Sequence, residues 1–101
     1  MNDECIMLEA LKMEWRLAWW CLPEEYRRRM RVPGFEVREM ESRWGAWYGD
    51  RRLLVLNSRL MTAATWPCIR EVLRHEMAHQ LSDEVLHSGQ ESHGDQFRDA
   101  C

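Results

Sequence analysis

The sequence predicts an α+β fold in which N-terminal helices and one long C-terminal helix pack on a three-stranded antiparallel sheet. Apolar residues recur every three or four positions near both ends of the chain, which is typical of helices. Between these regions, short apolar runs are separated by Pro-Gly and Gly-Asp turn signals, which is typical of strands. The length of 101 residues suits a single domain spanning 1–101.

The N-terminal part predicts one long helix and one short helix. Asn2 or Asp3 is suited to cap a helix that runs to about Cys21. Pro23 ends this pattern and can start a second helix over residues 24–30. The apolar positions that we expect to form the packing face of the first helix are Ile6, Leu8, Leu11, Trp15, Leu17, Ala18 and Trp19.

The middle of the chain predicts three strands, at residues 35–39, 43–48 and 51–58. An antiparallel meander is the simplest arrangement, because Gly49-Asp50 marks a turn between the second strand and the third. The third strand contains a short apolar run, Leu53 to Leu56. We expect it to lie beside the last helix, as an edge to which an extended peptide can add.

A long helix is predicted after Pro67, with Thr65 or Trp66 as its cap. Ser88-Gly89 is the signal that ends it. The positions with helical spacing are Ile69, Val72, Leu73, Met77, Leu81 and Val85.

Charge and composition exclude several classes of protein. The net charge of −3 argues against a general affinity for nucleic acid, which requires a basic surface. The chain opens with acidic residues where a secretion signal would be basic, and no apolar run is long enough to cross a bilayer. We therefore expect a cytoplasmic protein without membrane association. The four cysteines form no C-x-x-C pair, so no zinc ribbon is encoded.

The strongest chemical signal is an H-E-x-x-H motif, His75 to His79, within the long predicted helix. Residues four apart lie one turn apart on nearly the same helix face, so both imidazoles can reach one metal ion. Glu76 is rotated by about 100° from His75 and can face a metal-bound water without ligating the metal. The motif therefore predicts a Zn²⁺ site with Glu76 as general base.

A catalytic zinc site needs a third protein ligand and one open position. Asp83 and His87 are poor candidates, since a continuing helix carries each of them along its axis away from the first histidine. After the turn at Ser88-Gly89 the chain is long enough to bring back either Glu91 or His93. We favour His93 as the third ligand, because Gly94 follows it and eases a close approach of the backbone.

The motif residues resemble those of the SprT-like metallopeptidases, a family that includes bacterial SprT proteins and the Spartan proteases. The likeness is carried by His75 to Gln80, by Asp83 to Leu86, and by His93-Gly94 followed by Phe97. It extends over about Ser42 to Cys101, including a hairpin-like segment before the zinc helix. The resemblance implies that His75, His79 and His93 bind zinc and that Glu76 is the catalytic base.

The resemblance also implies a zinc-dependent endopeptidase acting on protein or peptide substrates. Many members carry a C-terminal zinc ribbon or DNA-binding part, and we expect this chain to be a minimal protease domain without one. Association with DNA is implied only by the family. Two alternatives are a nucleic-acid-binding module with a structural metal, and a protein-interaction domain with a vestigial metal site. A structural site would have no use for Glu76, which favours the enzyme.

Overall fold

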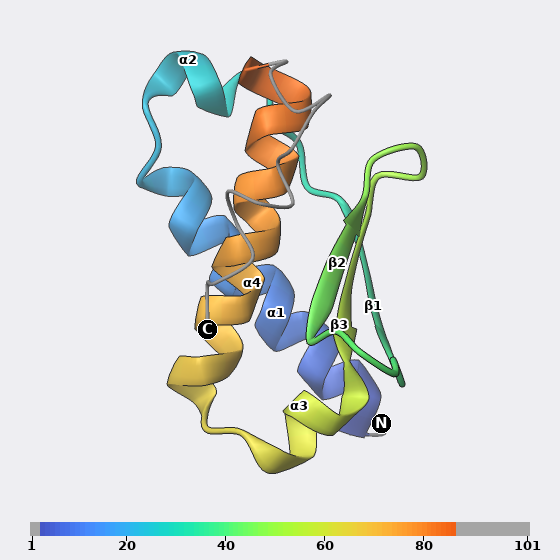
Figure 1. The fold of residues 1–101 in the computed structure, drawn as a ribbon. Helices are drawn as coiled ribbons and strands as arrows, with labels where there is room; N and C mark the ends of the chain where they lie inside the picture. Colours follow the sequence, from blue (N-terminus) through green and yellow to red (C-terminus); the bar gives the residue numbers. More distant parts are fainter. Residues whose placement is uncertain (1–2, 87–101) are drawn as a thin grey trace.

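The computed structural model of the chain describes residues 3–86, and residues 1–2 and 87–101 are outside this description. The elements in order are α1 (Asp3–Trp20), α2 (Glu24–Arg27), β1 (Gly34–Arg38), β2 (Gly45–Tyr48), β3 (Leu53–Asn57), α3 (Ser58–Ala63), α4 (Trp66–Leu81) and a π-helical turn, η1 (Ser82–Leu86). The α+β class, the N-terminal helix and the long helix near the C-terminus are confirmed (Figure 1). No helix in the described part is both long and apolar enough to span a membrane.

The predicted antiparallel meander is wrong, because the sheet is mixed. The strand order is β1-β3-β2, with β1 parallel to β3 and β2 antiparallel to it. After β1 the chain crosses the C-terminal end of β3 and continues as β2 on the other side of β3, in the opposite direction. The last residue of β3 holds this crossing: the Asn57 side chain donates hydrogen bonds to the carbonyl oxygens of Met40 and Arg43, at 2.9 and 2.7 Å.

The same topology overturns the expectation that residues 51–58 form an edge. β3 is the central strand, and its residues Leu54 to Asn57 are buried. Among the described strands β2 is the edge that packs against α4.

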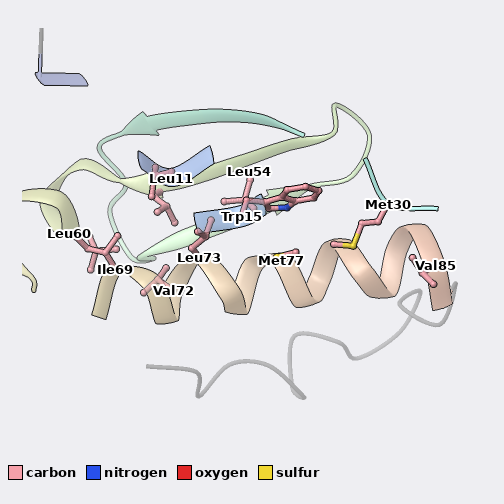
Figure 2. Packing of buried hydrophobic residues seen from close by; sticks show 11 residues of the cluster. Leu11, Trp15, Met30, Leu54, Leu60, Ile69, Val72, Leu73, Met77 and Val85 are labelled. Carbon is pink, nitrogen blue, oxygen red and sulfur yellow. The ribbon is translucent and has the colours of Figure 1, made fainter. Parts of the chain in front are cut away.

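The hydrophobic core lies between the sheet and the two long helices (Figure 2). Leu54 and Leu56 come from β3, Leu11 and Trp15 from α1, and the remaining side chains mostly from α4. The inner stripe of α4 is formed by Ile69, Val72, Leu73, Glu76, Met77 and Gln80, all buried. This stripe follows helical spacing, and it includes two polar residues.

The face predicted for the first helix is only partly correct. Leu11 and Trp15 are buried, but Ile6 and Leu17 are 55% and 53% exposed. The helix is apolar on more than one side, and only one side can face α4 and β1.

A buried amide connects α1, α4 and η1. The Gln80 side chain is fully buried and accepts a 2.9 Å hydrogen bond from the indole nitrogen of Trp15. Its own amide nitrogen donates to the backbone carbonyl of Arg31 and to Glu84, both at 3.0 Å. Glu84 is also paired with Arg52. Because a buried amide is costly unless it is bonded, this network specifies how α4 is rotated against α1.

We expect Gln80→Met to lower the free energy of unfolding by about 2–4 kcal/mol. The buried Trp15 N–H would lose its acceptor, and the backbone carbonyl of Arg31 would lose a donor. Urea unfolding of wild type, Q80M, W15F and the double variant measures the coupling between the two side chains. A coupling energy of about 1 kcal/mol or more is expected. Strict additivity of the two single effects would contradict the buried hydrogen bond.

Candidate metal centre

The two motif histidines lie on one side of α4, next to its buried stripe. His75 and His79 are one helical turn apart, and their ring centroids are separated by 5.0 Å with the planes at 85°. Both side chains are partly exposed. Glu76, which follows His75, and Gln80, which follows His79, are buried. The helix therefore presents two imidazoles at the rim of the core.

The separation of the rings suits a shared metal ion. Imidazole nitrogens bind zinc at about 2.0–2.1 Å, which places the centroids of two rings on a tetrahedral ion about 5 Å apart. Burial lowers the pKa of His75, so its imidazole is neutral at physiological pH. The neutral ring is the form that ligates metals. The pair thus fits the donor set that zinc prefers.

Glu76 is a carboxylate within an otherwise mainly apolar helix stripe. Its side chain is 7% exposed, and burial raises its pKa to about 7, an effect that the positive charge of Arg43 partly opposes. A carboxyl with a pKa near the working pH can both accept and release a proton, which is the property that a general base requires.

Gly45, the first residue of β2, allows the strand to approach Glu76. A Cβ atom placed there would lie 3.1 Å from Cγ of Glu76, 2.9 Å from Leu56 Cδ2 and 3.1 Å from the Val55 carbonyl oxygen. The backbone of Gly45 does not have a positive φ, so the glycine is required by space and not by conformation. The edge strand therefore lies directly against the Glu76 side chain.

Two further contacts hold the surroundings of the site in place. The Trp47 indole of β2 donates a 2.9 Å hydrogen bond to Asp83 of η1. Asn57 holds the loop that carries Arg43, because it donates to the Arg43 carbonyl. The turn after α4 and the loop before β2 are thus both tied to the sheet.

The structure places three of the four predicted site residues, His75, Glu76 and His79, within about one turn of α4. The preferred third ligand, His93, and its alternative, Glu91, lie outside the described residues, as does His87, which we judged a poor candidate. Among residues 3–86 no group of three or more His, Cys, Asp or Glu side chains is positioned to hold a metal ion. Asp83, judged a poor ligand from its place on the helix, accepts the hydrogen bond from Trp47 instead.

Sequence reasoning missed Gly45, Arg43 and Gln80 as residues that shape the site. A signal was present for Gln80 and Glu76, since both occupy core positions in the helical spacing of α4 and both are polar. No local signal marks Gly45 or Arg43, because their importance depends on how β2 meets α4.

We expect Gly45→Ala to destabilise the protein by about 1–3 kcal/mol and to displace the Glu76 side chain, because the added methyl overpacks the contact of β2 with α4. Gly34→Ala is the matched control, since its Cβ would meet only a flexible Leu53 methyl at 3.2 Å and a carbonyl oxygen at 3.7 Å. Chemical denaturation checks both variants. Equal stability of G45A and G34A would show that the close approach is not restrictive.

Comparisons with known proteins identify the family to which the chain belongs. A search of curated proteins finds no match to the chain. The family model described as SprT-like family matches residues 22–101, which include α2 to η1 and therefore the two histidines and Glu76. Because this match covers most of the 101 residues, the chain belongs to the SprT-like family.

Proposed function

We propose that this chain is a zinc-dependent metallopeptidase that hydrolyses peptide bonds in protein or peptide substrates. The observation that carries the proposal is the pair of imidazoles, 5.0 Å apart on α4, beside a buried carboxylate with a pKa of about 7. Membership of the SprT-like family supports a metallopeptidase-like domain. The buried Glu76 favours catalysis over a structural metal site, which needs no such base.

In this proposal His75, His79 and His93 hold the metal and leave one position open. When bound, zinc lowers the pKa of a coordinated water and polarises a substrate carbonyl. Glu76 accepts the proton of the attacking water and then transfers it to the leaving amine. Glu76 is buried, so the packing around it holds the carboxylate in place. The same burial keeps bulk water from competing for the proton.

The substrate would lie along β2. This strand is an edge of the described sheet, it packs against α4, and it begins at Gly45 beside Glu76. An extended peptide that added to β2 by main-chain hydrogen bonds would present a carbonyl close to the Glu76 carboxylate. The predicted edge at residues 51–58 cannot serve, since β3 is central.

We expect the purified protein to bind about one zinc ion per chain, and His75→Ala, His79→Ala and His93→Ala each to bind it much more weakly. Loss of one of the three ligands removes one bond to the metal and leaves only two protein donors. Elemental analysis after dialysis measures the zinc content. His87→Ala is the matched control and should keep its metal. Unchanged zinc in H75A and H79A would overturn the proposed site.

We expect Glu76→Gln to keep zinc but to lose peptide hydrolysis by a factor of about 10² or more, because the amide cannot accept the proton. Cleavage of an unfolded protein such as casein measures this activity. In the metal-free protein the carboxyl has its pKa raised to about 7 by burial, so wild-type stability falls as pH rises from about 4.5 to 7.

Gln at position 76 removes that titration. We therefore expect the metal-free E76Q protein to be more stable than wild type at pH 8, by up to about 3 kcal/mol. This distinguishes a catalytic defect from a folding defect. An E76Q protein that is folded, zinc-loaded and still fully active would contradict the assigned role of Glu76.

A further inference from the structure

One face of α1 is apolar and exposed, although α1 is a core helix. Ile6, Met13, Leu17 and Trp20 are 55%, 57%, 53% and 64% exposed, and the partly buried Ala10 lies among them. We call these five residues the α1 stripe. Exposed apolar residues that are contiguous on one surface mark interaction sites more often than isolated ones do. Figure 1 shows α1 crossing α4, so the helix has one side toward the core and another directed away from it.

The spacing of the α1 stripe is that of a coiled-coil seam. Its successive steps are four, three, four and three residues, from Ile6 through Ala10, Met13 and Leu17 to Trp20. The average of 3.5 residues keeps a seam in register with a second helix over its whole length. The stripe is also separate from the packing face, because Leu11 and Trp15, which are fully buried, lie between its members on the other side.

We propose that α1 pairs in antiparallel orientation with α1 of a second copy of this chain, forming a symmetric dimer through the α1 stripe. The occupant is specified by the charges that flank the seam. Glu9 and Arg16 both lie on one side of the stripe, each one residue before a seam position, and both are exposed. In an antiparallel pair such positions face each other across the seam, so Glu9 of each copy meets Arg16 of the other.

The opposite, parallel, orientation lacks this complementarity. There Glu9 would face the position of Glu14 in the second copy, a like charge. Glu14 is already engaged within its own chain, where it forms an ion pair with Arg70 at 3.3 Å and accepts from Trp66. Glu9 is 74% exposed and has only a loose pair with Lys12 at 3.5 Å, so its carboxylate remains accessible to a partner.

The C-terminal end of the α1 stripe is held in place for contact. The guanidinium of Arg27 in α2 stacks over the indole of Trp20, at 5.2 Å from the ring centre, and Trp19 meets the same indole edge-on at 5.1 Å. A restrained aromatic side chain loses little entropy when a partner covers it. Trp20 is therefore suited to be the anchor of the interface.

The size of the stripe predicts a weak dimer. Four half-exposed large side chains on each copy bury about 1,000 Å² in total, which is at the low end for specific protein interfaces. We therefore expect dissociation in the micromolar to high-micromolar range. The dimer is independent of the proposed zinc chemistry, so a negative result in the zinc experiments does not affect it.

Sedimentation velocity of the full chain, from low micromolar to several hundred micromolar, tests the dimer. The mass of wild type should rise from 12.2 kDa toward twice that value. Met13→Glu and Leu17→Glu should remain monomeric throughout. Val32→Glu is the control: it adds the same charge to a 38% exposed apolar residue in the segment between α2 and β1, outside the α1 stripe, and it should associate as wild type does. Circular dichroism confirms that all variants are folded.

Charge reversal tests the orientation at low salt. Glu9→Arg or Arg16→Glu alone should raise the dissociation constant about three- to ten-fold, and the double variant should restore it. The proposal is overturned if wild type is monomeric at every concentration, which would mean that another occupant covers the stripe. It is equally overturned if M13E and L17E associate like wild type, or if E9R strengthens association, as a parallel pair would require.

Discussion

The hydrogen bonds of the Gln80 side-chain amide constrain the rotation of α4 about its own axis. The amide has no exposure, and it joins the indole of Trp15, the backbone of Arg31 and the carboxylate of Glu84. A buried amide has only a few arrangements that satisfy its hydrogen bonds, so α4 cannot rotate about its axis without breaking them. Because His79 directly precedes Gln80, the same constraint determines where the two imidazoles of the motif point.

A second constraint follows from the position of Glu76. The rotation that buries Gln80 also buries Glu76, one turn earlier on the same stripe, and brings it against Gly45. Desolvation of a carboxylate opposes folding, and Arg43 only partly compensates for it. Proteins retain such groups where chemistry requires them, at some loss of stability. Under the proposed function, the departure of this helix from a purely apolar core has a chemical reason.

The N-terminal helix has two roles that its sequence does not separate. Trp15 contributes to the core and supplies the donor for Gln80, although it precedes the segment matched by the SprT-like family. The α1 stripe, on another side of the same helix, is left uncovered by the rest of the described chain. A helix that is apolar on two sides can complete the fold of its own chain and still present a surface for another.

The sequence by itself determined α1, α4, the approximate positions of the strands and the spacing of the H-E-x-x-H motif, because each depends on local spacing. It did not predict the short helix α3, which begins at Ser58 within the predicted third strand. The four-residue step between His75 and His79 places both on one helix face wherever that helix lies. The proposed role of Glu76 also follows from the motif, but its pKa does not, since burial depends on β2. His93 remains a sequence prediction.

Only the tertiary structure decided the order of the strands, the side of α1 that enters the core and the contact between Gly45 and Glu76. The strand segments permit both a meander and a crossing. In the structure the chain makes the crossing, and Asn57 bonds to the loop at residues 40 and 43 that forms it. Likewise, Ile6 and Leu17 have the same apolar character as Leu11, but only one side of a helix can face α4. Pairing, rotation and close approach arise from contacts between residues distant in the chain, and local propensity carries no information about them.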